Sequence, residues 1–157
     1  MKVVSVVGPK KSGKTSLVEA MVRSLAGRGR VGTAKNMPDH EIEDRGDTKR
    51  HFDAGADVVV GVGRDGVTLS VSRGGSLDYA LKALEYSGVD YAIIEGFKRS
   101  KLPKIVLGGI DVPNPIRKVD GRPPFDEGVI EELVNLLMTL PDYRSPGRGS
   151  EGISKPD

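Results

Sequence analysis

Residues 8–15 read Gly-Pro-Lys-Lys-Ser-Gly-Lys-Thr and match the pattern G-x-x-x-x-G-K-[ST]. In this pattern the glycines let the backbone curl, so that successive amides point toward phosphate oxygens. Lys14 would reach the β- and γ-phosphates as a catalytic lysine, and the Thr15 hydroxyl would ligate Mg²⁺. The stretch therefore predicts a phosphate-binding loop, with nucleotide-binding residues Gly8, Pro9, Lys10, Lys11, Ser12, Gly13, Lys14, Thr15 and Ser16.

The flanking sequence supplies the structural context that such a loop requires. Residues 3–7 are mostly β-branched and apolar on both faces, as in a strand buried in a parallel sheet. After the loop, apolar residues recur at helical spacing from Leu17 to Leu25, and Gly27 follows where a helix would end. Strand, loop and helix thus follow one another in the required order, and a chance match to the motif is disfavoured.

The rest of the chain continues to alternate between strand and helix patterns. Short β-branched runs predict strands, and apolar residues at helical spacing predict helices. The expected strands are 31–35, 58–62, 67–71, 91–94 and 104–107, and the expected helices are 48–56, the segment after Ser76 and a segment around 129–137 capped by Asp126. We therefore predict an α/β fold, P-loop NTPase-like, with a mostly parallel sheet, helices on both faces and an antiparallel β-hairpin extension bordering the sheet.

Length and composition bound the remaining possibilities. The 157 residues fit one nucleotide-binding domain over 1–140, with an irregular connection at 108–124 and a polar tail at 141–157 that we expect to be disordered. The formal charge of +2 is too nearly balanced for a protein dedicated to nucleic acid. No cysteine is present, and no apolar run approaches a membrane span, so we expect a cytoplasmic protein without thiol chemistry.

Phosphoryl chemistry also needs an acidic group that holds the metal or its waters. Glu95 follows an apolar strand and precedes Gly96, which leaves room for a ligand, so Glu95 is our main metal candidate. Asp47 lies in the polar segment 36–47, where capping of the next helix is an equal alternative to a metal role. His40 and His51 lack the spacing of a helical metal pair, which disfavours a transition-metal site.

A guanine-reading motif of the form Asn/Thr-Lys-x-Asp, which GTPases carry, has one faint match. Residues 154–157 read Ser-Lys-Pro-Asp, but they follow a polar tail rather than a buried strand. We therefore treat this match as chance, and the preference for GTP or ATP stays open at this point.

Several segments together resemble one known family, that of the MobB proteins of molybdopterin-guanine dinucleotide biosynthesis. They follow one another in the right order over about residues 1–107, and they are the loop 8–15, Val-Gly-Thr-Ala-Lys at 31–35, Asp-Thr-Lys-Arg-His at 47–51, Ala-Gly-Ala at 54–56, Glu-Gly-Phe-Lys at 95–98 and Pro-Lys-Ile at 103–105. The later segments are more distinctive than the phosphate loop, which many unrelated families share.

The resemblance implies a GTP-binding homodimer with weak, Mg²⁺-dependent GTPase activity that assists a molybdopterin guanylyltransferase partner or passes on the pterin cofactor. It also implies that Asp47, Arg50 and Glu95 surround the metal and phosphates, with Arg50 the candidate catalytic arginine. Lys98 and Lys104 are implied to meet an anionic pterin. No membrane or nucleic-acid partner is implied.

The chain departs from the family pattern at two positions. Asn36 stands where the family usually has histidine, and Gly46 stands where it usually has lysine. Both changes touch the polar loop and therefore bear on hydrolysis and on cofactor handling, whereas binding through backbone amides would survive them.

Two alternative functions remain open. One is a P-loop small-molecule kinase or ATP-dependent ligase, and the other is a nucleotide-dependent switch that pairs through the hairpin and binds no pterin.

Overall fold

The computed structural model describes residues 1–37, 46–64, 66, 68–72 and 74–145, and these residues form two compact units. The described part of the first unit is 1–36 together with 77–145, and that of the second is 37 and the described residues between 46 and 76. No helix in the described ranges is both long and apolar enough to cross a bilayer.

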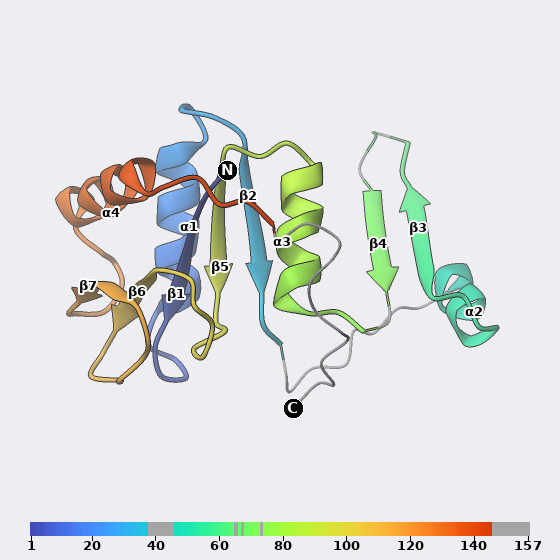
Figure 1. Cartoon of the computed structure of the whole chain (residues 1–157), viewed down its shortest axis with the longest axis horizontal. Coiled ribbons are helices and arrows are strands. Elements are labelled where there is room, and N and C mark those ends of the chain that lie inside the picture. Colours follow the sequence, from blue (N-terminus) through green and yellow to red (C-terminus); the bar gives the residue numbers. More distant parts are fainter. Residues whose placement is uncertain (38–45, 65, 67, 73, 146–157) are drawn as a thin grey trace. The chain divides into compact units, whose positions relative to one another are not determined.

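The first unit contains a five-stranded, entirely parallel sheet in the order β2-β5-β1-β6-β7. In chain order its strands are β1 (Lys2–Val7), β2 (Val31–Lys35), β5 (Tyr91–Glu95), β6 (Lys104–Leu107) and β7 (Pro115–Val119). Figure 1 shows β1 near the middle of this sheet, with β5 and β2 on one side and β6 and β7 on the other. Because all strands are parallel, their carboxyl ends share one edge, where ligands bind in open α/β sheets.

Helices cover both faces of the sheet, and side-chain alternation along the strands explains why. Val4 and Val6 of β1 pack with α1 (Lys14–Leu25) and α4 (Glu127–Thr139) in the larger core. Val3 of β1 faces the other way and packs near α3 (Leu77–Tyr86) in the smaller core. Since successive side chains of a strand point to opposite faces, an apolar strand of this kind must be buried on both. The predicted fold class is confirmed.

The second unit holds α2 (Asp47–Asp53) and the antiparallel pair β3 (Val58–Val62) and β4 (Thr68–Ser72). The hairpin was predicted to border the main sheet, but in the described residues it forms a separate two-stranded sheet. Val59 is buried, whereas Val58, Val60 and Val62 are 51%, 59% and 73% exposed. Their alternation along β3 leaves one row of valines in contact with solvent.

Two segments of the first unit differ from what the sequence predicted. The connection 108–124 contains the strand β7, which the sequence did not predict because it begins with proline and contains two basic residues. Residues 141–145, at the start of the predicted disordered tail, are bound to the sheet, because the Tyr143 amide donates to Met1 O at 2.8 Å and Asp142 pairs with Lys2 at 3.5 Å. Residues 146–157 lie outside the described residues.

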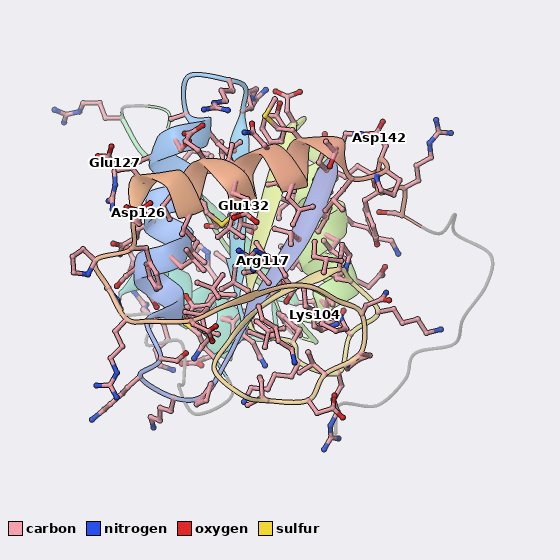
Figure 2. The ribbon with its side chains drawn as sticks, turned by 90° about the vertical axis from the view of Figure 1, so that its left-hand side faces the viewer. Lys104, Arg117, Asp126, Glu127, Glu132 and Asp142 are labelled. Carbon is pink, nitrogen blue, oxygen red and sulfur yellow. The ribbon has the colours of Figure 1, made fainter. Side chains whose placement is uncertain are left out.

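The predicted cap of the last helix is confirmed. The Asp126 carboxylate accepts from the Gly128 and Val129 amides at 2.8 and 3.4 Å. Figure 2 shows Asp126 at the start of α4, with Arg117 of β7 facing Glu132 on the same helix. The side chains at this end of the molecule thus fix α4 against the β7 edge of the sheet.

Candidate functional site

The loop between β1 and α1 has the backbone that phosphate binding requires. Lys11 and Gly13 have positive φ angles of 61° and 89°, so the chain turns sharply before the helix. A Cβ at Gly8 would lie 2.8 Å from the Leu107 carbonyl oxygen, so only glycine fits against β6. The loop therefore curls tightly at the carboxyl end of β1.

The amino terminus of α1 is left open to an anion. Gly13 is the N-cap, no side chain caps the first turn, and that turn contains no acidic residue. In addition, the Ser12 hydroxyl oxygen is buried without a hydrogen-bond partner among the described residues. Free amides and the helix dipole favour negative charge at such a terminus. This part of the site is suited to a phosphate group.

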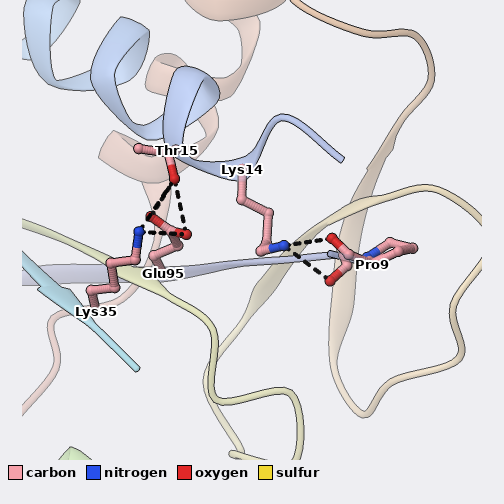
Figure 3. Close-up of polar contacts among 6 residues, drawn as sticks. Pro9, Lys14, Thr15, Lys35 and Glu95 are labelled. Carbon is pink, nitrogen blue, oxygen red and sulfur yellow. Dashed lines mark hydrogen bonds and ion pairs between the residues drawn. The ribbon is translucent and has the colours of Figure 1, made fainter. Parts of the chain in front are cut away.

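The Lys14 side chain folds back over the start of the loop. Its ammonium donates to the Gly8 carbonyl at 3.3 Å and to the Pro9 carbonyl at 2.6 Å, as Figure 3 shows. Partial burial lowers the pKa of Lys14, nearby Glu95 opposes this shift, and Lys98 and Lys35 add to it. The lysine cations therefore repel one another, and a polyanion bound among them would relieve the repulsion.

Thr15 and Glu95 form the central contact of the site. The Thr15 hydroxyl lies 3.1 and 3.0 Å from the two carboxylate oxygens of Glu95, which ends β5 and is 9% exposed (Figure 3). The residues are 80 positions apart in sequence. The parallel sheet brings them together because β5 lies beside β1, the strand that leads into the loop.

Lys35 joins this pair, although sequence reasoning did not assign it to the site. It ends β2 opposite Glu95, and its ammonium lies 3.4 Å from Glu95 Oε1 and 3.4 Å from Thr15 Oγ1. A cavity of about 420 Å³ adjoins the three residues, between α1 and β2, and its other lining residues are Val18, Glu19, Val22, Arg23, Thr33 and Ala34. Lys35 ends one of the segments that carry the family resemblance, but that resemblance gave it no role, and its place at the site follows from the register of β2 with β5.

The donor set at this contact fits Mg²⁺. A hydroxyl and a carboxylate are hard oxygen ligands, and Mg²⁺ is usually held by one or two such groups together with phosphates and water. Among the described residues no cluster of three or more histidine, aspartate or glutamate side chains could hold a metal alone. Thr15 and Glu95 would fill only part of the coordination shell of such an ion, which suits an ion that arrives with a nucleotide.

The remaining predicted metal and catalytic residues belong to the second unit. Asp47 is the first residue of α2, whose N-cap is Gly46, so Asp47 does not take the capping role. Its carboxylate lies 3.2 Å from the Arg50 guanidinium, and both side chains are exposed. His51 is an exposed residue of the same helix, and His40 lies outside the described residues. The roles of Asp47 and Arg50 at the metal and phosphates stay predictions.

Lys104 differs from what the resemblance implied. It is fully buried, and its ammonium donates to the Leu102 carbonyl at 2.9 Å and to the Ser100 carbonyl. Burial lowers the pKa of this lysine. Because its hydrogen bonds are used to hold the turn before β6, Lys104 is a structural residue and not a contact for an anionic pterin. Lys98 is exposed and acts electrostatically on Lys14.

The fold and this loop define the class of protein. A parallel sheet, a glycine-rich turn after its central strand, a helix that begins with Lys-Thr and an acidic residue ending the neighbouring strand together make a P-loop NTPase-like α/β domain. The chain belongs to the MobB family, because the family described as molybdopterin guanine dinucleotide synthesis protein B matches residues 3–117.

Individual relatives agree with this assignment. A Methanocaldococcus jannaschii protein, provisionally named a molybdopterin-guanine dinucleotide biosynthesis adapter protein, is 34% identical over 149 residues, which is 91% of this chain and 56% of that protein. The Haemophilus influenzae adapter protein of the same name is 28% identical over 142 residues, or 87% and 76% of the two chains. The chain thus spans little more than half of the first relative.

A solved structure supports the fold. The crystal structure of Bacillus subtilis MobB superimposes with a TM-score of 0.70 and covers 86% of this chain and 97% of that one. At 24% identity this similarity concerns the fold alone.

Proposed function

We propose that this protein is a Mg²⁺-dependent GTP-binding adapter in molybdopterin-guanine dinucleotide biosynthesis. The adapter role follows the names of its relatives, and the nucleotide role follows the site. In this proposal the amides of the loop 8–15 and the Lys14 ammonium hold the phosphates, while Thr15 and Glu95 hold Mg²⁺. The pathway partners would include the enzyme that attaches the guanylate and the pterin on which it acts.

The observation that carries the proposal is the pairing of an uncapped helix terminus with the Thr15–Glu95 contact. The terminus offers free amides to a phosphate, and the contact places two oxygen ligands beside it. Bound Mg²⁺ would neutralise phosphate charge and displace the Lys35 ammonium, which lies against both oxygens. We expect the displaced ammonium to contact the bound phosphates, since Lys35 lies beside Thr15 at the start of α1.

Replacement of Lys14 tests the nucleotide site directly. Lys14→Ala should weaken Mg²⁺·GTP binding by about 10- to 100-fold, because one charge-assisted contact to phosphate is lost. Isothermal titration calorimetry on the full chain measures the affinity. Lys82→Ala, at an exposed lysine of α3, is the matched control and should bind like the wild type. If the wild type binds no triphosphate, or if Lys14→Ala binds it equally well, the proposal is wrong.

Turnover separates an adapter from a small-molecule kinase. Both Glu95 carboxylate oxygens contact Thr15 Oγ1, so the carboxylate is not placed to orient an attacking water. We expect GTP hydrolysis at about 10⁻⁴ to 10⁻² per second, the range of GTPases without an activating protein. A steady-state phosphate-release assay measures this rate. The cavity beside Thr15 could instead hold an acceptor, and transfer to a metabolite at kinase-like rates would favour that second function.

Self-association through the hairpin is the second part of the proposal. Val58, Val60 and Val62 present an exposed apolar row on one face of β3, while Val59 on the other face is buried. A row of exposed β-branched residues on a two-stranded sheet is unusual for a monomer and favours burial against another surface. A second copy of this chain is the simplest surface of matching chemistry.

A charge placed in this row should break the dimer. Val60→Lys would bury an ammonium in the apolar contact and should weaken association by about 10-fold or more. Light scattering coupled to size-exclusion chromatography measures the mass over a range of protein concentrations. Thr68→Lys, at an exposed polar position of β4, is the matched control. If the wild type stays monomeric at high concentration, this part of the proposal is wrong.

A further inference from the structure

Asp120 follows β7 at the edge of the sheet that carries the phosphate loop. The five strands are parallel, so the residue after β7 lies at the same edge as the residue after β1. Two strand spacings separate β1 from β7, which amounts to about 10 Å. In open α/β sheets a bound nucleotide lies along this edge, in the crevice outside the carboxyl ends of the strands. Asp120 therefore stands at the right place for a group that contacts the base.

The order of the strands predicts which way a bound nucleotide extends along the edge of the sheet. Glu95, the proposed metal ligand, ends β5 on one side of β1, whereas β6 and β7 lie on the other side. A nucleotide whose metal-bound phosphates face Glu95 would extend its nucleoside toward β6 and β7. The cavity at Lys35 lies on the metal side and is not the base site.

The segment after Asp120 touches the phosphate loop. A Cβ built on Gly13 would lie 2.7 Å from Pro123 Cδ and 3.3 Å from Phe125 Cζ, so these two side chains pack against the loop. On the β6 side, a Cβ built on Gly108 would lie 3.4 Å from Pro9 Cδ, so Gly108 also lies against the loop. The chain from β7 to α4 thus forms a wall beside the phosphate site, with Asp120 at its start.

Asp120 and Glu127 are the acidic groups of this segment without a hydrogen bond or ion pair among the described residues, and Glu127 lies in the first turn of α4, where the helix dipole favours negative charge. Asp126 caps α4, and Glu132 binds the Arg117 guanidinium through two hydrogen bonds of 2.7 and 3.1 Å. The hydrogen bond and charge of Glu132 raise the pKa of Arg117, while Asp120 adds only a smaller electrostatic part. Asp120 itself is exposed and makes no hydrogen bond or ion pair among the described residues.

The local sequence shares part of the guanine-reading pattern. Lys118-Val119-Asp120 gives Lys-x-Asp, with Arg117 where the pattern has asparagine or threonine. Lys118 and Val119 are the last two residues of β7 and Asp120 follows them, and Val119 is 4% exposed, which fixes this end of the strand to the sheet. The aspartate of the pattern thus comes directly after a strand of the sheet, although β7 is an edge strand whose other residues are exposed or half-buried.

We propose that Asp120 reads the base of the bound nucleotide and selects guanine over adenine. Guanine presents two N–H donors, at N1 and at the 2-amino group, which one carboxylate accepts side by side. Adenine has an acceptor at N1 and no 2-amino group, so its edge would repel the carboxylate. This inference rests on the proposed nucleotide binding at the loop and explains its base preference.

The test exchanges the acceptor for an amide. Asp120→Asn should weaken Mg²⁺·GTP binding by about 10- to 100-fold, because a hydrogen-bonded pair of donors loses its charged acceptor. The same variant should gain affinity for xanthosine triphosphate, whose 2-oxo group accepts the new amide N–H. Calorimetric titrations with GTP, ATP, xanthosine triphosphate and inorganic tripolyphosphate give all four affinities. Asp111→Asn, at an exposed aspartate of the β6–β7 connection, is the matched control.

The outcomes separate this inference from the nucleotide proposal. Support requires that the wild type prefers GTP to ATP, that Asp120→Asn inverts the preference toward xanthosine triphosphate, and that tripolyphosphate binding is unchanged. If Asp120→Asn keeps the wild-type preference, or if the wild type binds GTP and ATP equally, the base-reading role is overturned while the phosphate site stands. If the wild type binds neither nucleotide nor tripolyphosphate, the proposed function itself fails. Asp120→Ala, which lacks both acceptor and amide, should lose GTP without gaining xanthosine triphosphate.

Discussion

The hydrogen bond between the Thr15 hydroxyl and the Glu95 carboxylate joins the parts on which the site depends. It links the first turn of α1 to the carboxyl end of β5, across 80 positions of sequence. Glu95 is almost buried, and a carboxylate with so little solvent needs polar partners to offset its desolvation. Thr15 and Lys35 provide those partners. These contacts fix the orientation of the Thr15 and Glu95 oxygen atoms, the proposed metal ligands, beside the loop.

The parallel sheet arranges the rest of the site along a single edge. The proposed phosphate donors lie at β1, the proposed oxygen ligands for a metal at β5, and the Asp120 segment at β7. Each position follows from strand order, because parallel strands deliver their carboxyl ends to the same side. A nucleotide bound along this edge would contact three connections that are distant in sequence. The second unit, with α2 and the hairpin, carries the polar and apolar surfaces suited to partners.

The sequence predicted the features that arise from local patterns. The loop, its strand and helix, Glu95 and the Asp126 cap each depend on a motif or on neighbouring residues, and the structure has them where expected. Lys35 was missed because its contact with Glu95 comes from the pairing of β2 with β5, which no local pattern reveals. Lys104 was misassigned for a related reason. Its contact with an anionic pterin was implied by the family resemblance alone, whereas its burial depends on carbonyls of the preceding turn. The strand β7 was missed because Pro115 and two basic residues obscure its alternation.

The central claim is that the backbone amides at the start of α1 bind a polyphosphate. Nuclear magnetic resonance of the ¹⁵N-labelled full chain, titrated with inorganic tripolyphosphate and Mg²⁺, tests it without assuming any base or partner. The account predicts saturable shifts of the Lys11, Gly13, Lys14 and Thr15 amide resonances, together with that of Glu95. Shifts confined to exposed basic residues away from the loop, such as Lys82 and Lys118, would contradict it.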